Sequence, residues 1–202
     1  MPRGWPIVGW AALAVATMIA VIVGVVGIGE DGIRMVVRAT ARTSVVLFGA
    51  AFVASALRRA WPGGTSRWLV ANRRYVGVSF AVSHFAHLLA LLALAHWSLR
   101  EMETAANPAT AILGGIAYVF IAAMVATSFD RTAAWLGPRR WSALHTAGMY
   151  WLWFIFFATF APKSPNSPLY AVLAFGLVAA LALRLRYRPA AVPTLAARAT
   201  AG

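Results

Sequence analysis

Apolar runs long enough to cross a lipid bilayer recur along this chain and constrain its fold more than any other feature. A spanning helix needs about 20 mostly apolar residues, because the hydrocarbon core is about 30 Å thick. We therefore predict an all-α integral membrane protein, a bundle of six transmembrane helices. The six predicted spans cover residues 6–28, 36–57, 75–97, 109–128, 141–161 and 169–187.

The composition agrees with a membrane protein. Of the 202 residues, 61% are hydrophobic and only 11% are charged, whereas a soluble domain carries about 25% charged residues. The net charge of +13 falls in short basic clusters between apolar runs, which is typical of membrane topology signals rather than of nucleic-acid binding. We therefore predict a lipid bilayer as the environment and no nucleic acid as a partner. The absence of cysteine excludes disulfides, cysteine-ligated iron–sulfur clusters and covalent haem attachment through CxxCH.

The charge distribution predicts the orientation of the chain. Lys and Arg are enriched in cytoplasmic loops, so the side that collects most arginines is expected to be cytoplasmic, with both termini there. We expect the bacterial inner (plasma) membrane as the location. The apolar run after the first residues is longer than the core of a signal peptide and is expected to be a retained first span. Residues 1–188 then form one membrane domain, and residues 189–202 form a loose cytoplasmic tail. The arginines on the predicted cytoplasmic side are Arg3, Arg58, Arg59, Arg67, Arg73, Arg74, Arg131, Arg139, Arg140, Arg184, Arg186 and Arg188.

Three of the four histidines, His84, His87 and His96, lie in the third apolar run, and His145 opens the fifth. Polar groups in hydrocarbon are costly and usually face the bundle interior. His84 and His87 lie about 60° apart on one helix face, whereas His96 lies near the outer end and is expected at the interface. Imidazoles from two helices in a dry interior are the ligands that a b-type haem requires. The hydroxyl groups expected to hold the second ring nitrogen of a ligand are those of Ser79, Ser83 and Thr146.

Two stretches resemble the ferric reductase-like transmembrane domain family, and within it the haem-binding membrane subunits of bacterial methionine sulfoxide reductase systems. The first is "NRRYVGVSFAVSHFAHLL" at residues 72–89, with the pattern RR-x-hydrophobic-G-x-x-x-F … H. The second is "TSFDRTAAWLGPRRWSALH" at residues 127–145, in which the matching residues are Thr127–Ser128, Leu136–Gly137, Trp141 and Leu144–His145. The resemblance implies a cytochrome-b-like bundle that binds haem b and passes electrons across the membrane.

The resemblance also implies a set of ligands. It places His87 on the family histidine of the third span and His145 on the first histidine of the fifth. The family's next histidine, 13 residues further on, is replaced here by Ala158, so we expect at least one haem but not a stack of two. The depth of each histidine in its helix favours a different pair, His84 with His145. Counted along the helix from Arg74, His84 lies about 15 Å and His87 about 20 Å into the third span. Counted from Arg140, His145 lies about 8 Å into the fifth span. Both His84 and His87 therefore stay candidates to share an iron with His145.

Arginines are candidates to hold the anionic groups of a cofactor. Arg34, Arg38 and Arg42 recur every four residues and form one stripe at the start of the second span. Arg42 is the deepest and is the best candidate to bind a haem propionate, while the others are expected to reach lipid headgroups. A flavin or quinone is expected at the cytoplasmic side. The arginines that could receive it are Arg73, Arg74, Arg139 and Arg140.

The chain has no room for a flavin or nicotinamide domain, so electron transfer needs a separate redox partner protein or a quinol. Two other functions are compatible with the sequence. A haem-free membrane protein would use its histidines for packing and act as an assembly or interaction factor, and Ala158 favours this alternative. A small transporter or proton channel would use the histidines as a relay, but acidic residues are nearly absent from the spans.

Overall fold

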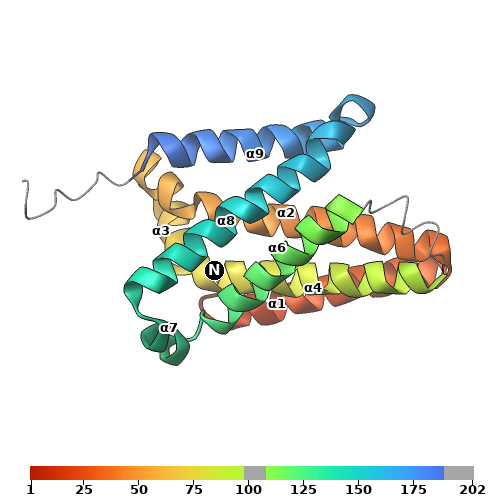
Figure 1. Ribbon diagram of the computed structural model, residues 1–202, viewed down its shortest axis with the longest axis horizontal. Helices are drawn as coiled ribbons and strands as arrows, with labels where there is room; N and C mark the ends of the chain where they lie inside the picture. The colour runs from red at the N-terminus through yellow and green to blue at the C-terminus, as the bar shows by residue number, and fades with distance from the viewer. Residues whose placement is uncertain (98–107, 189–202) are drawn as a thin grey trace, which may run out of the picture.

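The computed structural model describes residues 1–97 and 108–188, and every regular element in those ranges is a helix (Figure 1). The predicted tail at 189–202 lies outside the described residues, as do residues 98–107 between the third and fourth predicted spans. The elements are α1 (Pro6–Val26), α2 (Glu30–Ala60), α3 (Gly64–Ala71), α4 (Arg73–Trp97), α6 (Pro108–Ala126), α7 (Asp130–Leu136), α8 (Pro138–Phe160), the 3₁₀ helix η1 (Ala161–Asn166) and α9 (Pro168–Arg186).

The long apolar helices confirm that the chain is a multi-pass, all-α membrane protein. Five of the described helices, α1, α2, α4, α8 and α9, have the length and apolarity needed to cross a bilayer. The residues from Ala111 to Ala126 of α6 pass the same test only together with α7, and these two helices are bent by 108° at the break between them. The described residues therefore hold five spans, or six if this bent pair counts as one.

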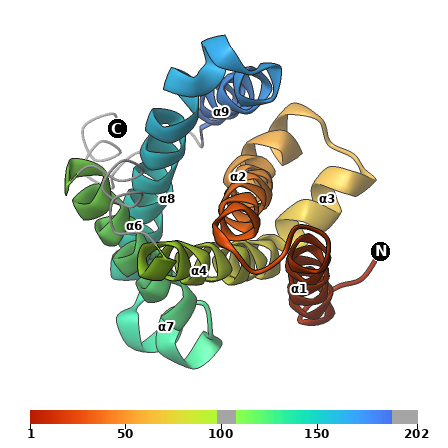
Figure 2. The same cartoon turned by 90° about the vertical axis from the view of Figure 1, so that its right-hand side faces the viewer.

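Helices α2, α4, α6, α8 and α9 surround a core that is rich in aromatic side chains (Figure 2). Helix α2 packs along α4, α6 packs on α8, and α9 contacts both α2 and α8. Helix α1 lies outside this ring against α2 and α4. The large side chains of the core include those of Phe48, Phe52, Phe80, Leu152 and Phe156. These side chains fill the space between the α2–α4 pair and the α6–α8 pair.

Small polar residues allow α2 and α4 to pack closely. Ser44, Ser83 and Thr40 are fully buried between the two helices. The Ser44 hydroxyl donates to Ser83 Oγ at 3.0 Å, and the Ser83 hydroxyl donates to the Thr40 carbonyl at 3.3 Å. Hydroxyl groups of this size are typical of interfaces between membrane helices, where they hydrogen-bond across a short gap between backbones.

Two local features differ from the predicted pattern. Helix α2 begins at Glu30, six residues before the predicted span, because Glu30 and Asp31 favour the positive end of a helix dipole and Glu30 pairs with Arg34 at 2.7 Å. The segments between predicted spans at residues 58–74 and 129–140 contain the short helices α3 and α7. Between α7 and α8, Gly137 adopts φ 78°, a conformation that favours glycine, and Pro138 opens α8.

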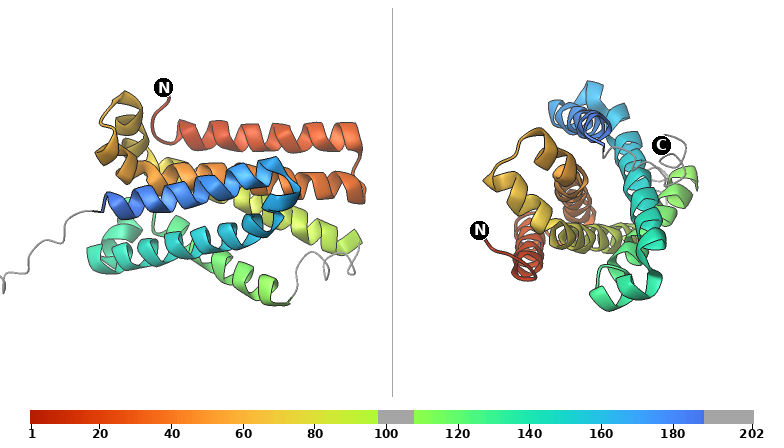
Figure 3. Two further views of the ribbon diagram at one scale, coloured as in Figure 1. Left: turned by 90° about the horizontal axis from the view of Figure 1, so that it is seen from above. Right: turned by 90° about the vertical axis from the view of Figure 1, so that its left-hand side faces the viewer.

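The direction of the helices alternates, so the arginines predicted to be cytoplasmic gather at one end of the bundle. Helices α1, α4 and α8 begin at this end, and α2, α6 and α9 finish there (Figure 3). We refer to it as the arginine-rich end. Glu30, Asp31 and Lys163 lie at the opposite end, next to the starts of α2 and α9.

Candidate functional site

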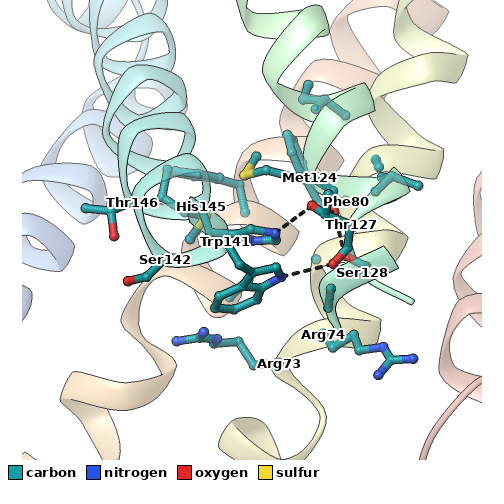
Figure 4. Close-up of a pocket in the computed structure, with 18 of the residues that line it drawn as sticks. Arg73, Arg74, Phe80, Met124, Thr127, Ser128, Trp141, Ser142, His145 and Thr146 are labelled. Atoms are coloured by element: carbon teal, nitrogen blue, oxygen red, sulfur yellow. Dashed lines mark hydrogen bonds between the residues drawn. The ribbon is translucent and has the colours of Figure 1, made fainter. Parts of the chain in front are cut away.

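A cavity of about 430 Å³ lies inside the bundle near the arginine-rich end (Figure 4). Residues of α2, α4, α6, α7, α8 and α9 all contribute to its walls. Cofactor sites typically measure about 300–1,000 Å³ and combine apolar walls with a few polar groups. The apolar part of this wall includes Phe48, Phe80, Ile121, Met124 and Met149. The cavity therefore has room for a small molecule between largely apolar walls.

His145 projects from α8 into this cavity and is held by two neighbours. Its Nε2 lies 3.1 Å from Thr127 Oγ1, and its ring stacks on Trp141 with centroids 4.1 Å apart. The Thr127 hydroxyl donates its own proton to the Ala123 carbonyl at 2.7 Å, so it accepts from His145 Nε2–H. The lone pair of the imidazole is then on Nδ1, which has no hydrogen-bond partner among the described residues. A histidine in this state is suited to bind a metal through Nδ1.

Trp141 completes the polar wall. Its indole Nε1 donates to the Thr127 carbonyl at 3.0 Å, as Figure 4 shows. The residues Thr127, Trp141 and His145, which carry the resemblance in the second stretch, therefore contact one another directly. In the sequence, only the place of Trp141 in the second stretch indicated a role for this residue.

Two guanidinium groups at the cavity have no carboxylate partner in the described part of the chain. Arg73 donates to Ser55 Oγ at 3.0 Å, and Arg184 donates to the Phe52 carbonyl at 2.8 Å while lying over the Phe52 ring. Arg74 differs, because it pairs with Asp130 at 2.6 Å. The cavity lining thus keeps an excess of positive charge, which favours a ligand with anionic groups.

His84 and His87 lie at a separate place, further along α4. Their rings stack with centroids 5.3 Å apart, which confirms the predicted common face. His87 Nδ1 lies 3.1 Å from the Val37 carbonyl, and because a carbonyl only accepts, this nitrogen carries the proton and Nε2 keeps the lone pair. His84 is buried between aromatic rings, and its Nδ1 has no hydrogen-bond partner. Neither histidine lines the cavity.

The contacts that His145 and His84 make with α6 and α8 show that these two histidines lie at different heights in the bundle. On α6, His145 bonds to Thr127 whereas His84 stacks on Tyr118, nine residues earlier, or about 13 Å along the helix. On α8, the His84 ring contacts Phe156, eleven residues beyond His145, or about 16 Å. An axial nitrogen lies about 2 Å from its metal, so one iron cannot take ligands from both levels as they stand. The replaced family position, Ala158, belongs to the level of His84.

The other predicted site residues occupy different places. Arg42 lies away from the cavity, where its Nη2 donates to the Tyr170 hydroxyl at 3.3 Å and its guanidinium lies over the Tyr170 ring. Ser79 and Ser83 were expected to hold a histidine, and this was wrong: they donate to backbone carbonyls. Thr146 lines the cavity, as do Arg73 and Arg74. The exposed residues of the set are His96, Arg139 and Arg140.

Arg184 is the cavity residue that the sequence analysis missed. It was counted only among the topology-setting charges at the end of the last span. Its position two residues before the end of α9 is the signal in the sequence, because an arginine inside an apolar helix needs a partner or a polar cavity.

The chain matches no protein-family model, no curated protein and no solved structure. The resemblance to the ferric reductase-like family therefore stays a prediction. Within the described ranges, no three His, Asp or Glu side chains are grouped so that they could hold a metal ion. The fold and the cavity define a helical multi-pass membrane protein with an internal, cationic site beside one histidine.

Proposed function

We propose that this protein binds one b-type haem in the cavity beside His145 and acts as the membrane subunit of an electron-transfer system. The observation that supports this proposal is the position of His145: its Nδ1, which has no hydrogen-bond partner, belongs to a cavity that combines apolar walls with two guanidinium groups that have no carboxylate partner among the described residues. A bound haem would supply a centre that accepts and releases one electron at a time. The proposal names one haem, since the second imidazole level is separate and Ala158 leaves it without a partner on α8.

The residues of the cavity fit the three parts of a haem. The apolar macrocycle matches the wall of Phe48, Phe80 and Ile121. Arg73 and Arg184 would hold the two propionates, because guanidinium–carboxylate pairs form strong charge-assisted hydrogen bonds. His145 would hold the iron. Its Nε2 is hydrogen-bonded to the Thr127 hydroxyl, as the second ring nitrogen of a ligand histidine usually has a hydrogen-bond partner.

Each polar residue has a distinct task in this arrangement. Thr127 holds the proton of His145 on Nε2 and so keeps Nδ1 available. Trp141 fixes the plane of the imidazole by stacking and is itself fixed by its bond to the Thr127 carbonyl. The aromatic core beyond the cavity excludes water from the interior of the bundle.

The orientation and the partners follow from the charge distribution. An arginine-rich end supports a cytoplasmic location for both termini in a bacterial inner membrane. The electron donor would be a flavin protein or a quinol that reaches the cavity from this end, and the acceptor would lie on the other side. Fusions of a fluorescent protein and of a periplasmic phosphatase to Arg188 and to residue Gly29 test the orientation: fluorescence is expected only at Arg188, and phosphatase activity only at Gly29.

The direct test of the proposed function is haem quantification in the purified protein. We expect about one haem per chain and a b-type band in the reduced-minus-oxidised spectrum. His145→Ala should lose the haem, whereas His96→Ala, which removes an exposed histidine, should retain it. A wild-type protein that folds in detergent but shows no b-type band after growth with added haem precursor would refute the proposal.

A haem-free membrane protein is the second candidate function. This candidate is favoured by the contacts of the histidines. Thr127 hydrogen-bonds to His145 Nε2 and Trp141 stacks on the His145 ring, while His84 packs among aromatic side chains. In that case His145 ties α8 to the end of α6 and has no ligand role. His145→Ala would then lower the thermal stability of the protein, and the wild type would show no haem spectrum.

A further inference from the structure

We infer that a second pocket, at the arginine-rich end, binds the phosphate of an anionic phospholipid headgroup. This pocket measures about 570 Å³ and shares no residue with the cavity beside His145. We call it the α1–α3 pocket, because the residues just before α1 line it together with α3 and the start of α4. The inference concerns a separate site and does not rest on the proposed function. The lining of the α1–α3 pocket includes Arg3, Gly4, Arg67, Trp68, Asn72 and Tyr75.

Hydrogen bonds between distant parts of the chain build this pocket. The Trp68 indole Nε1 donates to the Pro2 carbonyl at 2.8 Å. The Gly4 backbone N–H donates to Asn72 Oδ1 at 3.0 Å, and the buried Asn72 side chain also donates to the Trp68 carbonyl at 2.8 Å. The residues on both sides of Arg3 are therefore held against α3 and the start of α4 (Figure 3).

Two guanidinium groups line the pocket without any partner in the described part of the chain. Arg3 comes from the segment before α1, and Arg67 comes from α3. Neither side chain forms an ion pair or a hydrogen bond with another described residue, and no acidic residue of the described ranges lines the pocket. Arg74 differs, because it pairs with Asp130. The fork of N–H donors on a guanidinium matches the oxygens of a phosphate, so two such groups favour a phosphate as the ligand.

The pocket lies at the depth where a bilayer has its phosphate groups. Two spans begin beside it, α1 at Pro6 and α4 at Arg73. Two residues of its lining, Trp68 and Tyr75, are of the types enriched at the interface between membrane and water. Basic pockets next to the ends of spans are suited to bind anionic lipid headgroups. A phosphate held here would belong to a lipid of the leaflet at the arginine-rich end.

Helix α1 offers an apolar surface for the acyl chains of such a lipid. It lies outside the ring of core helices (Figure 2), and within α1 only Val15 is buried. Trp10 and Leu13, in the first half of the helix, are exposed. The chains of a lipid whose phosphate occupies the pocket can therefore lie along α1. A soluble phosphate would gain nothing from this surface, so we favour a lipid as the source.

The test is native mass spectrometry of the delipidated, full-length protein. The probes are phosphatidylglycerol, which is anionic, and phosphatidylcholine, whose headgroup has no net charge. We expect the wild type to prefer phosphatidylglycerol. Arg3→Gln combined with Arg67→Gln should lower its affinity about tenfold or more, because two charge-assisted contacts are lost. This variant should keep the wild-type melting temperature, since neither side chain bonds to another described residue.

The matched control is Arg139→Gln combined with Arg140→Gln, which removes two exposed arginines from the same end. It should bind phosphatidylglycerol like the wild type. An equal loss of affinity in both double variants would show that net charge attracts the lipid, and this would overturn the inference. Unchanged affinity in the variant of Arg3 and Arg67 would overturn it as well. Displacement of phosphatidylglycerol by millimolar inorganic phosphate would assign the pocket to soluble phosphate and overturn the choice of a lipid.

Discussion

Thr127 Oγ1 lies 3.1 Å from His145 Nε2, although 18 residues separate them in the chain. This hydrogen bond joins the end of α6 to the first part of α8, and the Trp141 indole reinforces it by donating to the Thr127 carbonyl. The short helix α7 and the turn at Gly137 bring the two segments back together. The three residues therefore act as one unit that presents His145 to the cavity.

Thr127→Val tests whether this unit prepares His145 for a ligand role. Valine has the shape of threonine but cannot accept the Nε2 proton, so the proton can move to Nδ1 and block the ligating atom. Loss of such a partner typically costs about 10–100-fold in metal affinity, and we expect a decrease of that size in haem affinity, measured by titration of the haem-free protein.

Thr159→Val is the matched control, because Thr159 is also on α8 and its hydroxyl donates only to the Ile155 carbonyl. It should bind haem like the wild type, and Thr127→Ser should restore most of the affinity. Equal affinity in the Thr127→Val and wild-type proteins would show that Thr127 has only a structural role.

Arg73→Gln tests the positive charge at the cavity. Glutamine can still donate to Ser55 but cannot form a charge-assisted bond to a propionate, a contact worth about 1.5–3 kcal/mol. We expect a decrease in haem affinity of about tenfold or more, with a steeper loss at high salt. Arg139→Gln removes an exposed charge from the same end and should leave affinity unchanged. If both variants lose affinity equally, the effect comes from net charge and not from the cavity.

The spans and the common face of His84 and His87 were predictable, because apolar runs and the 3.6-residue period are local properties. The relative height of the helices was not. Counting from the arginines suggested that His84 and His145 differ by about 7 Å in depth. In the structure α8 crosses the bundle at an angle, and the packing of Phe156 against Phe48 and Phe80 sets its height (Figure 1). Such packing depends on side chains from three helices, so no local pattern encodes it.

The site itself was predictable only in part. The second stretch drew attention to His145, and Thr127 belongs to the same stretch, so their contact joins residues that are near each other in the chain. Arg184 comes from α9, far away in the chain. The place of Arg42 in a stripe of arginines predicted an anion, and in the structure its Nη2 donates to Tyr170 of α9 while its buried Nε has no hydrogen-bond partner. A sequence of one chain does not show which distant side chain will satisfy a given cation.

Gly148→Ala should destabilise the protein through overpacking between α6 and α8. The new Cβ would lie 2.9 Å from Met124 Sδ and 3.2 Å from the Phe120 ring. The end of the Met124 side chain can move but the ring has little freedom, so we expect a loss of about 1–2 kcal/mol in the free energy of unfolding, measured by thermal unfolding in detergent. Gly176→Ala, whose Cβ would meet nothing within 4 Å, should show no loss. Adding Met124→Ala should relieve the clash; an additive double mutant would contradict this account.

Arg42→Met should weaken the attachment of α9 to α2 without affecting haem binding. The substitution removes a hydrogen bond to Tyr170 and a cation–π contact, while methionine retains most of the apolar volume. We expect a loss of about 1 kcal/mol in stability and an unchanged haem content. Arg38→Met, at an exposed position of the same stripe, should change neither quantity. Loss of haem from the Arg42 variant alone would place a propionate at the opposite end from the cavity.

His87→Ala separates the two histidine levels. His87 ties α4 to α2 through the Val37 carbonyl, so its removal should cost about 0.5–1.5 kcal/mol of stability. Because His87 and its stacking partner His84 lie about 13 Å from the level of Thr127, haem content should stay at the wild-type value. Haem quantification and thermal unfolding on the same preparation measure both effects. If His87→Ala loses its haem while His145→Ala keeps it, the haem lies at the level of Tyr118, with His87 Nε2 as its ligand, and the cavity serves another purpose.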